Sequence, residues 1–168
     1  MRSPRKESKK PLPKLIVFDF DGVLTDNRVL VFSDGTEAVM CSRSDGMAFD
    51  MFRAAHIRTL ILSTEKNSVV QARAQKLKTE VLQGTADKAA ALRDYCRRAR
   101  IKLEEVFFVG NDVNDLSVIS IVGKSFCPAD AHTQVKAAAS SILRTSGGSG
   151  VARELAEKVL GLAWNGST

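Results

Sequence analysis

The stretch Leu15-Ile16-Val17-Phe18-Asp19-Phe20-Asp21-Gly22 decides the fold class. Its first four residues form a short, continuous apolar run, which is typical of a parallel strand buried on both faces. Two aspartates, separated by one phenylalanine, follow directly, and a glycine closes the stretch. The pattern therefore predicts a buried strand that ends in a pair of carboxylates.

Strands and helices alternate along the rest of the chain. Two β-prone runs, 28–32 and 36–40, flank a Ser33-Asp34-Gly35 turn and predict a hairpin. Further strands are expected at 59–62, 80–82, 106–109, 124–127 and 141–143, and helices at 44–52, 67–78, 87–100, 113–121, 132–139 and 151–162. Because strands that alternate with helices form right-handed βαβ units, we expect an α/β fold: a Rossmann-like, doubly wound parallel sheet with a β-hairpin flap.

Composition and charge indicate one globular domain with a basic tail. The chain has 168 residues, of which 44% are hydrophobic and 26% charged. Residues 1–13 are polar, basic and rich in proline, which predicts a disordered tail, and residues 14–168 form the predicted domain. Six of the 25 basic residues and one of the 19 acidic residues lie in residues 1–14, so the remainder is nearly neutral. We therefore expect no nucleic-acid partner; a role for the tail in binding RNA or a membrane is a minor alternative.

Localisation follows from what the sequence contains. No apolar run approaches the roughly 18 to 20 residues that span a bilayer, and the basic N-terminus has no apolar stretch before a cleavage site. The three cysteines, Cys41, Cys96 and Cys127, are odd in number and show no Cys-x-x-Cys spacing. We expect free thiols, no membrane association and a cytoplasmic protein.

Polar clusters follow three of the predicted strands: Asp19 with Asp21, Ser63-Thr64-Glu65, and Gly110-Asn111-Asp112. Because ligands bind at the carboxyl ends of parallel strands, we expect these clusters to converge. Two neighbouring carboxylates repel unless a cation is bound or one is protonated. Mg²⁺ prefers one or two carboxylates together with water and phosphate. The sequence therefore predicts a Mg²⁺ site at Asp19 and Asp21, with Asn111 or Asp112 as the third ligand.

The same residues fit phosphoryl transfer. One aspartate can attack phosphorus to form an aspartyl-phosphate, while the other protonates the leaving oxygen and then activates water. Lys88, just inside a predicted helix, and the Ser63 hydroxyl can stabilise the phosphate oxygens. Each feature alone has an ordinary explanation as a turn, a cap or a solvated lysine. Four such sites in this order, each at a strand end or a helix start, favour catalysis.

With these motifs in place, the chain resembles the haloacid dehalogenase superfamily of phosphatases from Lys14 to Leu162. The motifs are residues 18–26, Ser63, Lys88 and residues 110–115. The resemblance implies that Asp19 is the nucleophile, that Asp21 is the acid/base, that Ser63 and Lys88 are catalytic, and that Mg²⁺ is the cofactor. No cap-domain insertion follows the hairpin or precedes Lys88, so the capless branch is expected.

Within that branch the chain is similar to phosphatases of 3-deoxy-ulosonic acid phosphates. These are the 3-deoxy-manno-octulosonate 8-phosphate and nonulosonate 9-phosphate phosphatases, together with the C-terminal domain of sialic acid cytidylyltransferases. Octulosonate phosphatases carry Thr-Gly-Arg at the second motif, whereas Glu65 followed by Arg73 and Lys76 resembles the nonulosonate group. The resemblance implies a sugar-acid phosphate substrate, with the nonulosonate 9-phosphate favoured. Candidate substrate-binding residues are Glu65, Arg73, Lys76, Arg43 and Gly148.

The resemblance also implies a homotetramer. In such proteins a hairpin, here residues 28–40, roofs the active site of the next subunit, and a glycine-rich segment, here 146–154, can enter it. Alternatives for Arg73 and Lys76 are a solvated basic helix face, or pairing with Glu65 across a subunit interface.

One position departs from the family pattern. The residue after Gly110 is usually Asp, and Asn111 removes one unit of negative charge from the metal site. Weaker Mg²⁺ binding is therefore expected. A second hypothesis follows: a catalytically weak or inactive oligomerisation domain associated with a sialic acid cytidylyltransferase.

Overall fold

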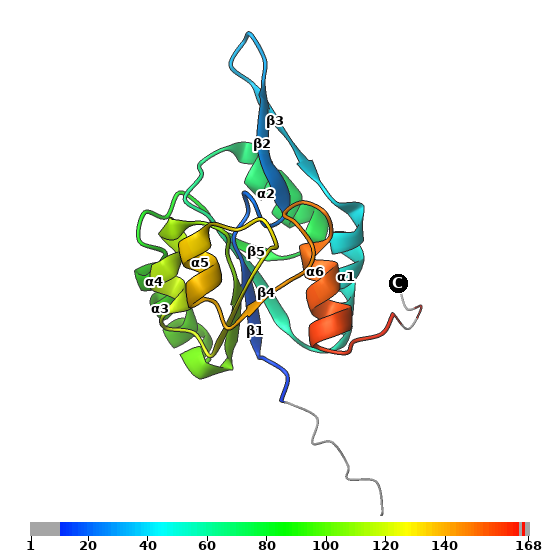
Figure 1. Cartoon of the computed structure of the whole chain (residues 1–168), viewed down its shortest axis with the longest axis vertical. Coiled ribbons are helices and arrows are strands. Elements are labelled where there is room, and N and C mark those ends of the chain that lie inside the picture. Colours follow the sequence, from blue (N-terminus) through cyan, green and yellow to red (C-terminus); the bar gives the residue numbers. More distant parts are fainter. Residues whose placement is uncertain (1–10, 165, 167–168) are drawn as a thin grey trace, which may run out of the picture.

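Strand β1 (Leu15–Phe18) lies inside a parallel sheet in the computed structural model, which describes residues 11–164 and 166. The sheet has six strands in the order β5-β4-β1-β6-β7-β8 (Figure 1). The other strands are β4 (Arg58–Leu62), β5 (Glu80–Leu82), β6 (Val106–Val109), β7 (Lys124–Cys127) and β8 (Ser141–Ile142). Every pairing in this sheet is parallel, as predicted. Residues 1–10 of the predicted tail lie outside the described residues.

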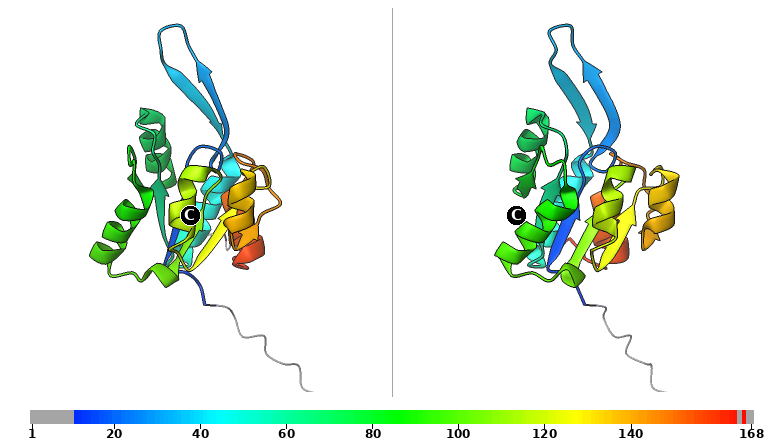
Figure 2. Two further views of the ribbon diagram at one scale, coloured as in Figure 1. Left: turned by 60° about the vertical axis from the view of Figure 1, so that its left-hand side comes forward. Right: turned by 90° about the vertical axis from the view of Figure 1, so that its left-hand side faces the viewer.

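Alternate side chains of β1 enter two separate apolar cores. Ile16 and Phe18 point to one face of the sheet, Leu15 and Val17 point to the other, and all four are fully buried. The first face is covered by α1 (Arg43–Ala54), α2 (Ser68–Leu77) and α6 (Val151–Glu154). The second is covered by α3 (Lys88–Ala99), α4 (Leu116–Ile119) and α5 (Thr133–Ala138). Helices thus flank the sheet on both faces (Figure 2), which confirms the doubly wound α/β fold.

The direction of strand addition reverses beside β1. The chain passes from β1 through α1 and α2 to β4 and β5 on one side, then crosses along α3 to β6 on the other side. In open α/β sheets, ligands bind in the crevice outside the carboxyl ends of the strands at such a switch point. Asp19 follows β1 and Gly110 follows β6, so the predicted polar clusters lie at this crevice.

The predicted flap is a hairpin of β2 (Thr25–Val31) and β3 (Glu37–Cys41), which projects from the end of the molecule where β1 ends (Figure 1). Gly35 turns the chain at φ 85°. The hairpin begins three residues earlier than predicted, because β2 continues through an irregularity between Thr25 and Val29 that holds Asn27 at φ 65°. Within the described chain, this hairpin is the only insertion between β1 and α1, as the capless prediction requires.

Two predicted helices are broken into shorter pieces. The one expected over 113–121 is a 3₁₀ turn, η2 (Val113–Asp115), followed by α4, because Asp112 and Asp115 form a capping box there. The one expected over 151–162 is α6 followed by a π-helical turn, η3 (Leu155–Val159). Leu160 N donates to Leu155 O, and Gly161 at φ 67° then ends the helix.

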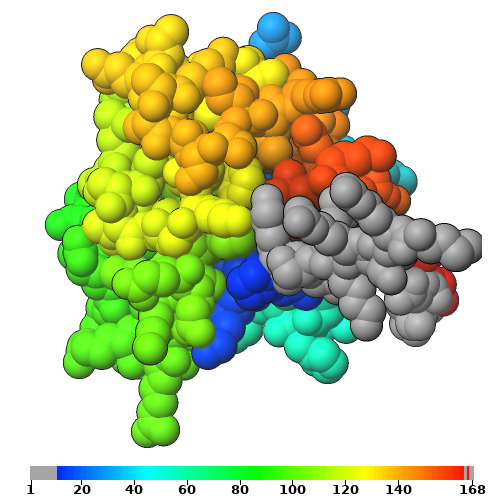
Figure 3. All heavy atoms as spheres, turned by 60° about the horizontal axis from the view of Figure 1, so that its bottom comes forward, coloured from blue at the N-terminus to red at the C-terminus, as the bar shows by residue number. Residues whose placement is uncertain are grey.

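The end of the molecule opposite the hairpin is where the chain enters β1. There Lys14 N donates to Glu105 O at 2.9 Å, and Arg58 N donates to Lys14 O at 3.1 Å. Figure 3 shows this end, with the first residues of the strand (blue) between the segment after α3 (green) and the segment after α1 (turquoise). In the part of the chain that the structure describes, no helix has both the length and the apolar character to cross a bilayer.

Candidate active site

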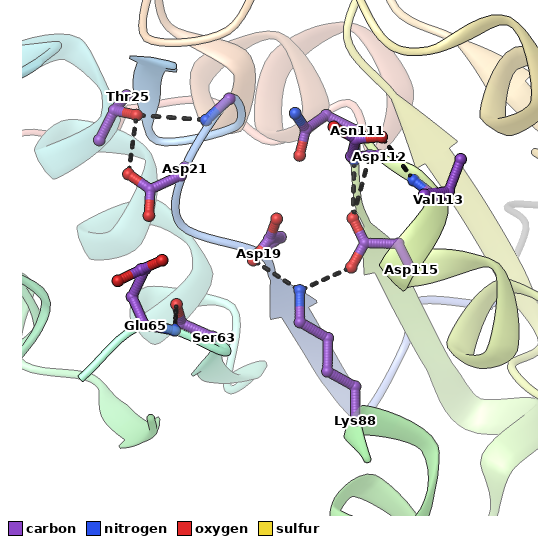
Figure 4. Close-up of polar contacts among 11 residues, drawn as sticks. Asp19, Asp21, Thr25, Ser63, Glu65, Lys88, Asn111, Asp112, Val113 and Asp115 are labelled. Carbon is purple, nitrogen blue, oxygen red and sulfur yellow. Dashed lines mark hydrogen bonds and ion pairs between the residues drawn. The ribbon is translucent and has the colours of Figure 1, made fainter. Parts of the chain in front are cut away.

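A buried ion-paired cluster lies at the carboxyl end of β1. Lys88, the first residue of α3, places its Nζ 2.8 Å from Asp19 Oδ1 and 2.7 Å from Asp115 Oδ1 (Figure 4). All three residues are buried, with exposed fractions of 2%, 6% and 0% for Lys88, Asp19 and Asp115. The Asp87 side chain caps the helix on Ala90 N and fixes the start of α3, which places the Lys88 ammonium in the cluster. The single ammonium of Lys88 therefore forms ion pairs with two carboxylates.

This cluster shifts the protonation equilibria of its members. Burial, and then the Asp115 charge, raise the pKa of Asp19 to about 7, although Lys88 acts in the opposite direction. Burial acts to lower the pKa of Lys88, but Asp19 and Asp115 outweigh it and raise that pKa. The lysine thus stays charged beside Asp19. A carboxylate that a charged ammonium holds in a fixed orientation suits a nucleophile.

Asp21 lies on the loop after β1, beside Asp19 but more open to solvent. Burial, and then the nearby Glu65 charge, raise its pKa, while the hydrogen bond from Thr25 opposes the shift. A raised pKa increases the fraction of carboxyl that carries a proton, which suits a group that protonates a leaving oxygen. The predicted acid/base residue is therefore in a suitable environment.

The Asn111 amide faces both aspartates. One terminal atom of this amide lies 2.8 Å from the Asp21 carbonyl oxygen and 3.1 Å from Asp19 Oδ2. If this atom is the amide nitrogen, it donates a hydrogen bond to each of the two oxygens. If it is the amide oxygen, three oxygen atoms face one another, and a bound cation is needed to offset their repulsion. Such spacings match neighbouring ligands of an octahedral Mg²⁺, which at 2.0–2.1 Å from the metal lie about 2.9 Å apart. The residues present therefore fit Mg²⁺.

Gly22 makes room for this amide. A Cβ on residue 22 would lie 2.0 Å from Asn111 Nδ2, and the backbone there has φ 79°. Only glycine combines that conformation with so close an approach. The Asp-x-Asp-Gly sequence is thus explained by the site as well as by the turn.

The Asp112 carboxylate has a different contact. It is exposed, and its Oδ1 accepts from Val113 N at 2.7 Å, which caps η2. Of the two candidates for the third metal ligand, Asn111 faces Asp19 and Asp21, whereas Asp112 lines the outer part of the cavity.

Ser63 and Glu65 enter from the end of β4. The Ser63 side chain is 2% exposed, and its Oγ accepts from Glu65 N at 3.1 Å, which leaves the hydroxyl hydrogen available for a ligand oxygen. Glu65 is exposed at the rim. Both residues line the same cavity as Asp19, so the second predicted motif joins the first.

The cavity has a volume of about 260 Å³. It is lined by Asp19, Asp21, Asn27, Ser63, Thr64, Glu65, Asn111, Asp112, Val113 and Asn114. No lysine or arginine is among these residues. Within the described chain, positive charge reaches the cavity from Lys88, which is buried behind Asp19. Asn27, Val113 and Asn114 are not among the predicted site residues, although Val113 and Asn114 lie within the fourth motif and Asn27 directly follows the first.

Four predicted substrate-binding residues lie outside this cavity. Arg73 donates from Nη2 to Ser42 O at 2.7 Å, where it holds the start of α1, while Lys76 and Arg43 are exposed. Gly148 packs against the loop after β1, with its N–H bonded to Val23 O at 3.0 Å. Their roles as substrate contacts stay predictions, and within one chain only Glu65 of the predicted set reaches the cavity.

Asp115 was missed as a site residue. Its Oδ2 accepts from Asn111 N at 2.9 Å, while its Oδ1 binds Lys88, so it positions both. A signal was present: an aspartate four residues after Asn111 at a helix start can cap that turn, and a buried lysine needs a buried counter-charge.

Comparison with known proteins finds relatives along most of the chain. Residues 48–155 match the family model of haloacid dehalogenase-like hydrolases. The chain is 30% identical over 148 residues to the 3-deoxy-D-manno-octulosonate 8-phosphate phosphatase of Haemophilus influenzae, which covers 88% of this chain and 82% of that protein.

Solved structures agree. A HAD family hydrolase from Streptomyces avermitilis is 45% identical, with a TM-score of 0.86 and 90% of each chain covered. The 3-deoxy-D-manno-octulosonate 8-phosphate phosphatase from Moraxella catarrhalis, solved with magnesium, phosphate and KDO, is 28% identical, with a TM-score of 0.85. That match covers 89% of this chain and 86% of the other.

Proposed function

Because this chain belongs to the haloacid dehalogenase-like hydrolases, we propose that it is a Mg²⁺-dependent phosphatase that forms an aspartyl-phosphate on Asp19. One observation carries the proposal. Asp19 Oδ1 is held by the buried ammonium of Lys88, while Oδ2 faces Asn111 at the crevice where the sheet binds ligands. This carboxylate is therefore both oriented and accessible.

In the first step, a carboxylate oxygen of Asp19 attacks phosphorus, and the bond from phosphorus to the ester oxygen breaks. Lys88 keeps the carboxylate oriented and adds positive charge beneath the transferring group. The Ser63 hydroxyl is placed to donate to a phosphate oxygen. The leaving oxygen takes a proton from Asp21 and departs as an alcohol.

In the second step, Asp21 accepts a proton from water as the water oxygen attacks phosphorus. The acyl-phosphate bond breaks, inorganic phosphate leaves, and Asp19 returns to a carboxylate while Asp21 regains its proton. Each aspartate thus ends the cycle as it began.

The metal would be held by Asp19 Oδ2, the Asp21 carbonyl oxygen and the Asn111 amide oxygen. Mg²⁺ supplies positive charge for the phosphate oxygens when bound. Because Asn111 is neutral, this set carries one carboxylate charge fewer than the family pattern, and we expect a comparatively weak site.

The substrate we propose is a 3-deoxy-ulosonic acid phosphate. The names of the relatives support octulosonate 8-phosphate, whereas Glu65 at the cavity rim supports nonulosonate 9-phosphate. A sugar acid of this class carries a carboxylate as well as a phosphate. The cavity of one chain offers no lysine or arginine for that carboxylate, which supports a homotetramer in which a neighbouring subunit supplies it.

A catalytically weak oligomerisation domain is the second candidate function, and Asn111 favours it. The complete Lys88, Asp19 and Asp115 cluster opposes it, because a scaffold has no need of a buried charged network. Calorimetric titration with MgCl₂ distinguishes the two, since a pure scaffold binds no metal at this site.

The test is phosphate release by the full chain with MgCl₂ from a panel of sugar phosphates that includes both ulosonic acid phosphates. We expect turnover of an ulosonic acid phosphate, and a phosphorylated peptide containing Asp19 in the mass spectrum of quenched enzyme. Asp19→Asn should abolish both signals. Asp94→Asn, on the surface of α3, removes an equivalent carboxylate far from the site and should leave both intact. A folded protein that turns over nothing in the panel would refute the proposal.

A further inference from the structure

The Thr25 hydroxyl is fully buried beside Asp21. Its Oγ1 accepts from Gly22 N and from Asn27 N, each at 3.2 Å. The same oxygen lies 3.4 Å from Asp21 Oδ1 (Figure 4). A hydroxyl has two lone pairs and one hydrogen. Since both lone pairs face backbone N–H groups, the hydrogen is left for Asp21. The direction of this hydrogen bond is therefore set by the backbone.

The loop that carries both residues is held on several sides. The Phe20 carbonyl oxygen accepts from the N–H groups of Val23, Leu24 and Thr25 at 2.9–3.3 Å, which closes a tight turn after β1. Gly147 packs behind this turn: a Cβ there would lie 2.2 Å from Gly22 O. The loop cannot shift toward that side without a clash.

The same glycine is anchored from another loop. Gly147 N donates to Asp130 Oδ1 at 2.9 Å, and Gly148 N donates to Val23 O. The hydroxyl is therefore fixed relative to β1, and with it the direction from which Asp21 Oδ1 is bound.

We propose that Thr25 is a positioning residue that aims Asp21 Oδ2 at the leaving oxygen. Among the described residues, the Thr25 hydroxyl is the one hydrogen-bond donor to the Asp21 carboxyl group. With Oδ1 held by Thr25, Oδ2 is the oxygen that faces the cavity and carries the transferable proton. This inference rests on the proposed function, in which Asp21 protonates the alcohol as its bond to phosphorus breaks.

Such a role predicts dependence on the leaving group. A sugar alcohol is a poor leaving group unless it is protonated, whereas p-nitrophenolate departs without a proton. The value of kcat/KM reports only the steps up to release of the alcohol or phenol, so it isolates the proton transfer by Asp21 from the later attack of water. A change that displaces the nucleophile, the metal or the whole loop lowers kcat/KM for both esters by the same factor.

The experiment compares kcat/KM for 3-deoxy-manno-octulosonate 8-phosphate and p-nitrophenyl phosphate in wild type, Thr25→Val and Thr25→Ser. General acid catalysis contributes about 10²- to 10⁴-fold to the rate, and a misoriented Asp21 carboxyl group should lose part of this contribution. We expect Thr25→Val to lower the value for the sugar phosphate about ten-fold or more relative to p-nitrophenyl phosphate. Thr25→Ser, which keeps the hydroxyl, should restore the wild-type ratio. Circular dichroism and urea midpoints verify that each variant is folded.

A double-mutant cycle tests whether Thr25 acts through Asp21. Adding Thr25→Val to Asp21→Asn should not change the ratio of the two substrates any further. An equal loss for both esters, or a serine variant that behaves like valine, would overturn the positioning role while the phosphatase stands. A folded wild-type enzyme that hydrolyses neither of these esters nor nonulosonate 9-phosphate would overturn the proposed function itself.

Discussion

Lys88 and Lys14 both form ion pairs with carboxylates, but only the ion pairs of Lys88 are buried. The Lys88 side chain is 1% exposed between Asp19 and Asp115, whereas the Lys14 side chain is 61% exposed beside Glu105. Removing one partner of a buried pair leaves an uncompensated charge and costs about 3–5 kcal/mol, while exposed pairs contribute about 0–1 kcal/mol. We therefore predict that Lys88→Met loses activity and about 3–5 kcal/mol of unfolding free energy in urea titrations. Lys14→Met should lose less than about 1 kcal/mol, and equal losses would contradict the account.

Asn111 determines the charge of the proposed metal site. Asn111→Asp adds a carboxylate that faces Asp19 Oδ2 and the Asp21 carbonyl oxygen, without changing the shape of the side chain. Because affinity for hard cations rises with ligand charge, we predict roughly ten-fold tighter Mg²⁺ binding by calorimetry. Asn114→Asp is the matched control, since it adds the same charge at the cavity rim. If both variants tighten Mg²⁺ binding equally, the added negative charge acts through the electrostatic potential of the cavity as a whole, and Asn111 is not a metal ligand.

The residues proposed to carry the chemistry could be identified from the sequence because each lies next to a local signal. Asp19 and Asp21 follow an apolar run, Ser63 ends a strand, and Lys88 follows an N-cap. Asp115 binds Asn111 and Lys88, which are 4 and 27 residues away in the sequence. Its contact with Lys88 forms only when α3 and η2 pack together, so the role of Asp115 is difficult to predict from the sequence. The contact of Asp45 with α6 spans more than 100 residues, so no local pattern contains it.

At the scale of elements, Asp45 joins α1 to α6. It is 1% exposed, and its Oδ1 accepts from Ala152 N at 3.0 Å and Arg153 N at 3.3 Å, at the first turn of α6. Its Oδ2 is buried and has no hydrogen-bond partner among the residues that the structure describes. Burial raises the pKa of Asp45 to about 6, although both amides and Arg73 act in the opposite direction. The charged form is thus disfavoured in the folded state.

This shift predicts a pH-dependent stability difference. Since the folded state holds the Asp45 proton more tightly than the unfolded state, stability falls as the pH rises from about 4 through about 6. A shift of about two pH units corresponds to about 3 kcal/mol at most. Asp45→Asn keeps an acceptor for α6 and cannot ionise. Its unfolding free energy relative to wild type should therefore increase by up to about 3 kcal/mol between pH 4 and pH 7.

Urea titrations at pH 4, 5.5 and 7 measure this difference. Asp50→Asn, on the half-exposed side of the same helix, accounts for the general effect of removing a carboxylate. A difference between Asp45→Asn and wild type that stays constant across this range would refute the link between Asp45 and stability.

Element types were easier to predict than element ends. Strands such as β1 and β6 are short apolar runs buried on both faces, so hydrophobic pattern and structure agree. Where the expected helix over 113–121 becomes a 3₁₀ turn and a short helix, the capping box of Asp112 and Asp115 reshapes the chain to present Asn111. The departure from regular structure therefore occurs at the candidate site.

At the scale of the whole molecule, the hairpin exposes an apolar surface that one chain does not cover. Its exposed apolar side chains are Val29, Leu30, Val31, Phe32 and Met40, which are 49–72% exposed. Contiguous exposed apolar residues mark interaction surfaces, and an isolated two-stranded hairpin is only marginally stable in water. The hairpin projects from the end of the molecule where β1 ends (Figure 1), and Asp19, which follows β1, lines the cavity, so a neighbour bound to the hairpin lies close to the site. This arrangement supports the predicted homotetramer.

We predict that the double variant Leu30→Asp/Val31→Asp dissociates the predicted tetramer, because burying two carboxylates in an apolar interface is strongly unfavourable. Light scattering after gel filtration measures the mass. Ile142→Asp, at an exposed apolar position on the sheet edge, should remain tetrameric.

A dissociated enzyme keeps Asp19, Asp21 and Lys88 but lacks a cation for the sugar carboxylate. It should therefore lose turnover of ulosonic acid phosphates while retaining that of p-nitrophenyl phosphate. Equal loss of both activities would show that the neighbour shapes the catalytic site itself, and a monomeric wild type would refute the assembly.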